Sequence, residues 1–420
     1  MRRKKSTNSH WLGPGLVTGA ADDDPSGIAT YSQAGARFGF GLLWTVFLTT
    51  PFMIAIQLVS AHIGRVTGNG IVANVKAFYP RPVLVVLLGL LVAANTINIA
   101  ADIAAMGEAL YLVIGGLKHE HALLLGGVSV VLQVFVPYRR YAPILKVLTL
   151  VLFLYVATAF TVEIPWSQAL FKTVWPTIAL DRNYLLTVVA VLGTTISPYL
   201  FFWQASQEVE EMRSGRRLRP LKALTHGGTP ELDRMAVDTT VGMIFSNVIA
   251  YFIMLTTAAT LHAKGVTEIE TAAQAAEALR PIAGELTFLL FALGIIGTGL
   301  LAVPVLAGSA AYAVAEALGW KSTLEARPSQ AAGFYAIIAA ATLIGIAMSF
   351  SPIDPIQMLF WTAVINGVVA VPVMLVMMLV ATNPSVMGRF VVRSGLAVGG
   401  WAATGLMGVT LAALLVSLVL

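Results

Sequence analysis

The chain has 420 residues, of which 57% are hydrophobic and only 11% are charged. Ordinary soluble domains carry about 25% charged residues, so this composition predicts an integral membrane protein. The net charge of +5 is explained better by membrane topology than by nucleic acid, because no nucleic-acid-binding motif interrupts the apolar segments. Cysteine is absent, which excludes disulfides and thiolate metal sites.

About eleven segments are apolar over roughly the 20 residues that a membrane-spanning helix needs. The alternation that is typical of membrane β-strands is absent. We therefore predict an all-α polytopic membrane protein. The predicted helices are 12–37, 41–64, 82–115, 120–138, 142–163, 184–212, 231–262, 284–316, 329–349, 356–381 and 396–419.

The basic residues predict the orientation of these helices. If the N-terminus is cytoplasmic, most of the 26 lysines and arginines fall in cytoplasmic segments, including Arg2, Arg3, Lys4 and Lys5. The positive-inside rule favours this arrangement, and an odd number of spans then places the C-terminus outside. We expect a multi-pass protein of the plasma membrane, in a bacterium the inner membrane.

Two connections are longer than the others. The stretch 213–230, RSGRRLRPLKALTHGGTP, is predicted to be a cytoplasmic loop that anchors the topology, although basic loops also bind lipid or regulate. The stretch 263–283 is predicted to be an external loop whose Ala/Glu-rich part forms a short helix.

Two of the predicted spans contain helix-breaking sequences. Asp24-Pro25-Ser26-Gly27 interrupts the first span, and GTTISPYLFFWQ places Pro198 inside the sixth. A proline in a helix interior removes a hydrogen bond and clashes with the preceding turn. Each break falls in the first helix of a block of five, and because five is odd the two blocks run in opposite directions through the membrane. Matching breaks of this kind point to a transport site at the midplane.

These blocks define the expected domain organisation. The whole chain, 1–420, is predicted to be one transport domain. Its first repeat is 12–163, its second repeat is 184–381, and 396–419 is an additional helix.

The first break carries the chemistry of a cation site. Unwound backbone exposes carbonyl oxygens, and Asp24 adds a negative charge. Oxygen donors of this kind suit a hard cation. Alternatively, Asp24 caps the second half of the helix by accepting from the amides of Gly27 or Ile28. We favour a ligand role, because a cap does not need the matching break. Asp22 and Asp23 are either vestibule charges that attract cations or members of structural hydrogen bonds.

Further polar residues within the apolar segments are candidates for the pathway. Asp102 is interpreted as a pathway or structural carboxylate, and Asn366 either reaches the water shell of the ion or bonds a neighbouring helix. Gln207 and Glu208 either face the inner vestibule or belong, with Glu210 and Glu211, to a solvated cytoplasmic helix end. The second interpretation is favoured. Asp238 and Asn247 are expected to be packing or gating groups.

The stretches GPGLVTGAADDDPSGIATYSQAGA at 13–36 and AADIAAMGEAL at 100–110 resemble the first and third helices of the NRAMP transporters of divalent metals. The resemblance implies a LeuT/APC-type inverted repeat, helices 1–5 against 6–10, with helices 1 and 6 broken. The family motifs are Asp-Pro-Gly-Asn in helix one and Met-Pro-His in helix six. By this resemblance Asp24 is a metal ligand, and the carbonyl of Ala21 and the region of Thr194 border the ion.

The chain departs from the family motifs at four positions. Gly27 stands where the family has its asparagine ligand, Ser197 where it has methionine, and Tyr199 where it has histidine. In helix three Asp102 is kept, whereas Ala105 stands where the family has its proton-relay glutamate.

These departures change the expected ion. A thioether favours transition metals, so its replacement by Ser197 removes discrimination against hard ions. Mg²⁺ usually keeps several waters and suits a roomy site of oxygen donors, which Gly27 allows. The loss of histidine and glutamate removes two groups that carry protons. The chain therefore resembles the NRAMP-related magnesium transporters (NRMT), whose members move Mg²⁺ and Mn²⁺ without proton coupling.

The resulting prediction is a secondary transporter for Mg²⁺ and Mn²⁺, working by alternating access as a monomer in the lipid bilayer, without a cofactor, nucleic-acid partner or enzymatic activity. The metal site is predicted to contain Asp24, Ala21, Gly27, Thr194 and Ser197, with Asp23, Thr195, Tyr199, Asp102, Asn366 and Gln207 nearby or along the pathway. The alternative is a proton-coupled Mn²⁺/Fe²⁺ importer. A sodium-coupled amino-acid transporter fits the three aspartates poorly, and an intramembrane enzyme would need paired catalytic groups that the sequence lacks.

Overall fold

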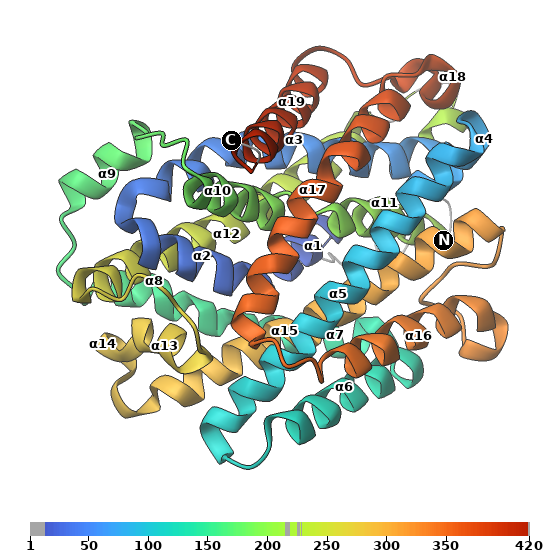
Figure 1. Cartoon of the computed structure of the whole chain (residues 1–420). Coiled ribbons are helices and arrows are strands. Elements are labelled where there is room, and N and C mark those ends of the chain that lie inside the picture. Colours follow the sequence, from blue (N-terminus) through green and yellow to red (C-terminus); the bar gives the residue numbers. More distant parts are fainter. Residues whose placement is uncertain (1–12, 215–218, 225–226, 228, 419–420) are drawn as a thin grey trace, which may run out of the picture.

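The computed structural model describes residues 13–214, 219–224, 227 and 229–418, and the regular structure within these ranges is helical (Figure 1). The α-helices are α1 (Pro14–Asp22), α2 (Pro25–Phe38), α3 (Leu43–Thr67), α4 (Ile71–Phe78), α5 (Arg81–Ile114), α6 (Lys118–Phe135), α7 (Tyr138–Thr149), α8 (Phe153–Ala159), α9 (Trp166–Val174), α10 (Arg182–Thr195), α11 (Pro198–Ser214), α12 (Thr229–Thr260), α13 (Ala272–Ala276), α14 (Arg280–Ala283), α15 (Thr287–Leu318), α16 (Ala332–Met348), α17 (Pro355–Ala381), α18 (Pro384–Met387) and α19 (Ser394–Ser417).

Each predicted span corresponds to helix in the structure, with small differences at the ends. The first predicted span is divided into α1 and α2 and the sixth into α10 and α11, so both predicted breaks are confirmed. The predicted span 142–163 is also divided, because one turn of 3-10 helix at Leu150–Leu152 separates α7 from α8. The short helix expected in the connection 263–283 is confirmed as α13.

The length and composition of the helices agree with a multi-pass membrane protein. Seven segments in the described ranges are long and apolar enough to cross a membrane, and two shorter apolar helices accompany them. The seven segments are Pro25–Thr67, Arg81–Ile114, Arg182–Arg213, Pro230–Lys264, Ala272–Leu318, Pro355–Ala381 and Ser394–Ser417.

The long helix α5 is central to the core and is surrounded by α6, α15, α16 and α17 (Figure 1). Its middle part is almost entirely buried. Polar contacts tie it to α15, because the Asn95 side-chain amide donates to the carbonyl of Leu306 at 2.9 Å and to the Ser309 hydroxyl at 2.7 Å. The helix therefore forms a fixed support beside the two broken helices.

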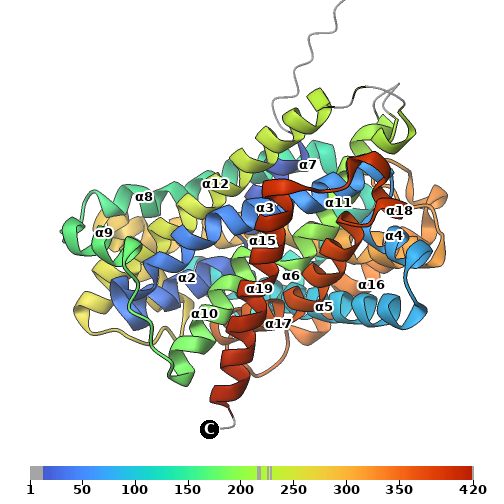
Figure 2. The ribbon, with the colours of Figure 1, turned by 90° about the horizontal axis from the view of Figure 1, so that it is seen from above.

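The other central helix, α12, packs against α1, α2 and α3. Glycines permit a close approach of α1 to α12: a side-chain carbon on Gly19 would overlap the carbonyl of Gly242, and one on Gly15 would overlap the backbone of Thr239. The last helix of the described chain, α19, packs against α3, α10 and α17 (Figure 2).

The basic segments that predicted the topology are only partly described. Arg2, Arg3, Lys4 and Lys5 lie outside the described residues. In the connection after α11, Lys222 donates to the carbonyls of Ser385 at 2.9 Å and Val386 at 2.7 Å, so this part of the basic loop is attached to α18.

Candidate metal-ion site

The first helix break lies between Asp22 and Pro25. α1 ends at Asp22, Asp24 has extended backbone, and Pro25 begins α2. Proline suits this first helical position because its missing N–H would have no intrahelical partner there. The Asp24 Oδ1 atom accepts from the Gly27 amide at 2.8 Å and from the Ser26 hydroxyl at 2.6 Å. The capping role considered for Asp24 is thus present, and it leaves the second carboxylate oxygen for other partners.

The second break lies between Thr195 and Pro198, where hydroxyl groups satisfy the last carbonyls of α10. The Ser197 hydroxyl donates to the carbonyls of Gly193 at 2.9 Å and Thr194 at 2.8 Å. The Thr195 hydroxyl donates to Val191 at 2.6 Å. Bonds of this kind compensate the carbonyls that a helix end leaves without partners. The hydroxyls of Ser197 and Thr195 are therefore both directed at backbone carbonyls of α10.

The two breaks face each other in the buried centre of the molecule. The Tyr199 hydroxyl, at the start of α11, lies 3.1 Å from the Ala21 carbonyl and 3.1 Å from Asp24 Oδ2. Gly27 faces Thr194, because a side-chain carbon on this glycine would lie 3.3 Å from Thr194 Oγ1. Asp24 is only 1% exposed. Four of the predicted site residues thus meet: Ala21, Asp24, Gly27 and Thr194.

A second tyrosine, Tyr31, joins the two broken helices at another place. The hydroxyls of Tyr31 in α2 and Thr195 in α10 lie 3.2 Å apart. Both residues are buried. This contact joins α2 to the end of α10, and it does not direct the Thr195 hydroxyl at Asp24.

Asp22 and Asp23 are directed at α12 instead of the site. The Ser246 hydroxyl lies 2.5 Å from Asp22 Oδ2 and 3.0 Å from Asp23 Oδ1. Both carboxyl groups are buried. Of the two interpretations considered, the structural hydrogen bond is the one present in this arrangement. Ser246 was not singled out in the sequence, where a serine inside an apolar helix carries no specific signal.

Asp102 lies on α5 beside the first break. It is 0% exposed, and neither of its oxygens has a hydrogen-bond partner among the described residues. It is close enough to Asp24 for their charges to interact. Asn98, one turn earlier on the same helix, has a side-chain amide that is likewise unpartnered within the described ranges. The sequence signal for Asn98 is its spacing of four residues from Asp102, which places both on one helix face.

Asn366 and Gln207 lie on the helices expected, and within the described residues neither forms a hydrogen bond to the breaks. Asn366 is buried in α17, and its side-chain nitrogen lacks a partner within the described part of the chain. Gln207 is half-buried in α11, and its side-chain nitrogen also lacks a partner there. In α12, Asn247 donates to the Thr50 hydroxyl at 3.0 Å, which agrees with a packing role.

The expectation of a solvated end for α11 is wrong for two of its three glutamates. Glu208 is 2% exposed and Glu210 is 5% exposed. The Gln204 side chain explains the position of Glu208, because its amide donates to Glu208 at 3.1 Å while its carbonyl accepts from Thr18 of α1 at 2.5 Å. Glu210 is covered because α15 and the connection that follows it pack over this end of α11.

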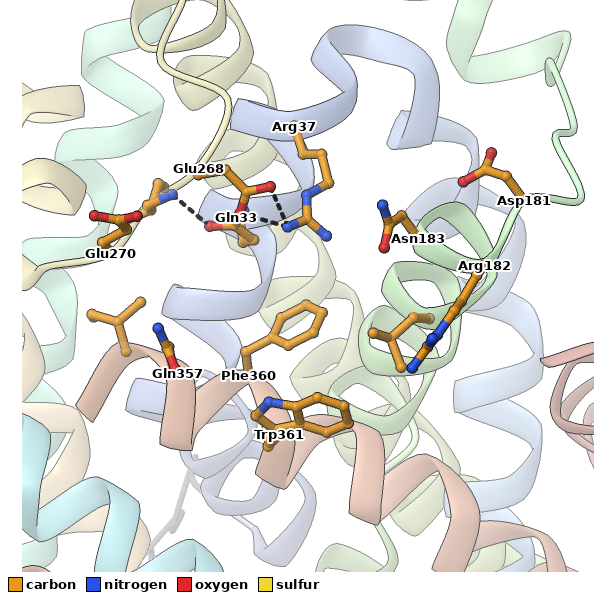
Figure 3. Close-up of a pocket in the computed structure, with 13 residues that line it drawn as sticks. Gln33, Arg37, Asp181, Arg182, Asn183, Glu268, Glu270, Gln357, Phe360 and Trp361 are labelled. Atoms are coloured by element: carbon orange, nitrogen blue, oxygen red, sulfur yellow. Dashed lines mark hydrogen bonds and ion pairs between the residues drawn. The ribbon is translucent and has the colours of Figure 1, made fainter. Parts of the chain in front are cut away.

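A pocket of about 750 Å³ opens at the other end of α2 (Figure 3). Gln33 and Arg37 of α2 meet Glu268 on one side, while Gln357, Phe360 and Trp361 of α17 face them. Gln33 lies about 9 Å along α2 from Gly27 at the rise of a regular helix. The pocket therefore lies along the helix that begins at the break, at the end predicted to face the outside.

Comparisons with known proteins agree with this architecture. The sequence profile described as "Natural resistance-associated macrophage protein-like" (Nramp) matches residues 15–417. The divalent metal cation transporter MntH of Klebsiella pneumoniae (strain 342) is 30% identical over 298 residues, covering 69% of this chain and 68% of that protein. MntH of Yersinia pestis (strain Pestoides F) is 28% identical over the same length.

Solved structures show the same fold at low sequence identity. The manganese transporter of Eremococcus coleocola superposes with a TM-score of 0.74 and 14% identity, covering 95% of this chain and 84% of that one. Mhp1, a nucleobase-cation-symport-1 family transporter in a closed conformation, gives a TM-score of 0.55 at 14% identity, covering 97% and 91% of the chains. These likenesses confirm the predicted LeuT-type architecture, and the profile match over almost the whole sequence establishes that the chain belongs to the Nramp family.

Proposed function

We propose that this protein transports divalent metal cations across the membrane. The observation that carries the proposal is the convergence of Asp24 Oδ2 and the Ala21 carbonyl, both at the first helix break, on the Tyr199 hydroxyl beside the second break. Oxygen donors held by unwound backbone suit a hard divalent cation. The curated relatives in the same family are described as divalent metal cation transporters, which supports a transporter rather than an enzyme.

We further propose Mg²⁺, with Mn²⁺, as the transported ion, as in the NRMT branch. The oxygens proposed to face the ion are the Asp24 carboxylate, the Ala21 carbonyl and the Thr194 hydroxyl, and in this structure the Tyr199 hydroxyl donates to the first two. Gly27 presents no side chain toward Thr194 and so leaves room for water on the ion. Ser197 stands where the family motif has a thioether, and the loss of this soft donor favours hard ions.

Transport without proton coupling is the third part of the proposal. Tyr199 and Ala105 stand where the family motifs have histidine and glutamate. One observation favours the alternative, a proton-coupled Mn²⁺/Fe²⁺ importer. Asp102 is buried in α5 with neither oxygen bonded among the described residues, and an ionisable group within a membrane segment is a candidate for carrying protons. One experiment therefore has to distinguish uncoupled transport from proton-coupled transport.

The proposal also covers the domain organisation of the protein and its orientation in the membrane. We propose one transport domain over 1–420 with repeats at 12–163 and 184–381 and an additional helix at 396–419. The protein would act as a monomer in a bacterial inner membrane, with the N-terminus in the cytoplasm and the C-terminus outside. The concentration of basic residues in the predicted cytoplasmic connections supports this orientation.

The test uses the purified full chain in liposomes, with Mg²⁺, Mn²⁺ and Ca²⁺ offered side by side and a pH-sensitive dye in the lumen. We expect uptake of Mg²⁺ and Mn²⁺ without acidification of the lumen. Acidification that follows metal uptake would replace the uncoupled mechanism by the proton-coupled alternative. Uptake of none of the three ions above that of empty liposomes would contradict the transport function itself.

A further inference from the structure

The Tyr199 hydroxyl joins the two broken helices through the oxygens expected to bind the ion. It lies 3.1 Å from the Ala21 carbonyl and 3.1 Å from Asp24 Oδ2, and all three residues are buried. Because a phenol has one proton, this is a three-centre hydrogen bond, in which one donor serves two acceptors. The two acceptors belong to the first break, and the donor belongs to the helix that follows the second.

An ion and this hydrogen bond exclude each other. Mg²⁺ binds oxygen ligands at about 2.0–2.1 Å, so an ion held by both acceptors would lie close to the line along which the phenol proton points toward them. The proton must then turn away before the ion can bind. When no ion is bound, the hydroxyl proton therefore lies near the position of the ion, and its partial positive charge faces the same two oxygens.

Asp24 needs such a partner whenever the ion is elsewhere. Taking a carboxylate out of water without donors is strongly unfavourable. Ser26 and Gly27 donate to Oδ1, and both belong to the same helix as Asp24. Among the described residues, Tyr199 is the donor to Oδ2 that comes from the second broken helix. Tyr199 is thus placed both to hold the two breaks together and to compensate the negative charge of Asp24.

We propose that the Tyr199 hydroxyl takes the place of the ion between the two breaks during the ion-free half of the transport cycle, and so permits the unloaded carrier to reorient. The inference rests on the proposed function, uncoupled metal transport. A carrier without proton coupling must return with neither metal nor proton at Asp24, and a donor supplied by the protein makes this return possible. Tyr199 acts here as a positioning residue for Asp24 and Ala21.

Tyr199→Phe separates the return step from the loaded step. Net uptake into liposomes that contain no metal requires return of the unloaded carrier, whereas exchange of labelled for unlabelled Mn²⁺ does not. We expect Tyr199→Phe to lower net Mn²⁺ uptake about tenfold, the effect of one hydrogen bond to a charged group, while exchange stays at the level of the unchanged protein. The concentration of Mn²⁺ that half-saturates exchange should fall, because the ion no longer displaces a hydrogen bond.

Tyr155→Phe is the matched control. Tyr155 is also a buried tyrosine, and its hydroxyl interacts with Ser32 of α2 and not with Asp24 or Ala21. Its removal should leave both net uptake and exchange unchanged. Tyr199→His provides a second variant, because its imidazole N–H retains a donor, and it should recover net uptake relative to Tyr199→Phe. The lumenal pH dye should show no acidification during this uptake, which excludes recovery through a proton carried by the histidine.

The outcomes distinguish this inference from the proposed function. Equal loss of net uptake and exchange in Tyr199→Phe would overturn the inference, because it would assign Tyr199 to ion binding or folding. No change in either flux would overturn it as well, and so would a Tyr199→His variant that exchanges metal normally but does not recover net uptake. If the unchanged protein moves no metal in either assay, the proposed function fails instead.

Discussion

The Asp238 carboxylate accepts from the Gly15 amide at 2.7 Å and thereby caps the beginning of α1 from a different helix, α12. Its other oxygen accepts from the Gly13 amide at 3.1 Å. The first amides of a helix have no intrahelical partner, and a negative charge placed there also interacts favourably with the helix dipole. Together with the close packing at Gly15 and Gly19, this cap holds α1 against α12. Movement of α1 away from α12 has to break it.

Loss of this cap should open the end of α1 that is predicted to face the cytoplasm. Because the chain contains no cysteine, Thr18→Cys provides a single reporter at a fully buried position of α1. In that background we expect Asp238→Ala to increase labelling by a water-soluble maleimide roughly fivefold, since a lost helix cap costs about 1 kcal/mol. Asp238→Asn keeps one oxygen acceptor and should give an intermediate rate. Equal labelling of all three proteins would contradict a restraining role for Asp238.

Glu210 should be the most important of the α11 glutamates for stability. Its carboxylate accepts from the Tyr312 hydroxyl at 2.9 Å, the Thr323 hydroxyl at 2.9 Å and the Leu324 amide at 3.0 Å. Glu210→Ala would leave three donors without this acceptor, so we expect the free energy of unfolding to fall by about 3 kcal/mol. The measurement is reversible unfolding in mixed detergent.

Two variants serve as controls for Glu210. Tyr312→Phe removes one donor and keeps the ring, and should cost about 1 kcal/mol. Glu211→Ala changes a half-buried glutamate on the same helix end and should cost less than Glu210→Ala. A Glu210→Ala variant as stable as the unchanged protein would show that these contacts contribute nothing to folding.

The helices and their breaks were predictable because the signals are local. An apolar run of about 20 residues predicts a membrane helix wherever it packs. Proline alone does not predict a break, because Pro51, Pro304 and Pro372 lie inside unbroken helices. Pro25 and Pro198, however, are accompanied by glycine, serine or threonine residues that favour unwinding. The capping of α2 by Asp24 also depends only on residues that follow it in the sequence. These features therefore hold regardless of how the helices are arranged.

The partners of the site residues were not predictable, because they come from distant parts of the chain. The contact of Tyr199 with Ala21 and that of Ser246 with Asp22 depend on which faces of the helices meet. The burial of Glu208 and Glu210 has the same origin. A glutamate at the end of a predicted membrane helix is normally expected to be exposed to solvent. Glu208 and Glu210 are buried because neighbouring helices pack against α11.

Asp24→Asn should separate the charge of Asp24 from its capping role. An asparagine at this position keeps a carbonyl oxygen for the Gly27 amide, so α2 remains capped. It removes the negative charge, and we expect Mg²⁺ and Mn²⁺ uptake to fall by roughly a hundredfold or more because a buried cation needs an opposite charge. Asp24→Ala should abolish uptake and in addition lower the stability by about 1 kcal/mol through loss of the cap. Both quantities can be measured on the same samples, by uptake into liposomes and by thermal unfolding.

The two Asp24 variants together show whether Asp24 binds the ion or only caps α2. If Asp24→Asn transports as well as the unchanged protein, the charge has no part in ion binding and Asp24 serves as a cap alone. If both variants are inactive and Asp24→Asn retains the stability of the unchanged protein, the loss of uptake is due to the charge.

Ser197→Met tests the identity of the ion. Its thioether would add a soft donor beside the second break, and we expect the uptake of Mn²⁺ relative to Mg²⁺ to rise on the order of tenfold. Ser197→Ala is the control, because the serine hydroxyl donates to the carbonyls of Gly193 and Thr194 within its own helix. Its removal should leave the ratio unchanged. A Ser197→Met protein with the original ratio would contradict the argument that oxygen donors select Mg²⁺ here. A loss of Mg²⁺ uptake in Ser197→Ala would instead mean that the Ser197 hydroxyl leaves the carbonyls of α10 and binds the ion during transport. Selectivity would then depend on this hydroxyl ligand as well as on the missing thioether.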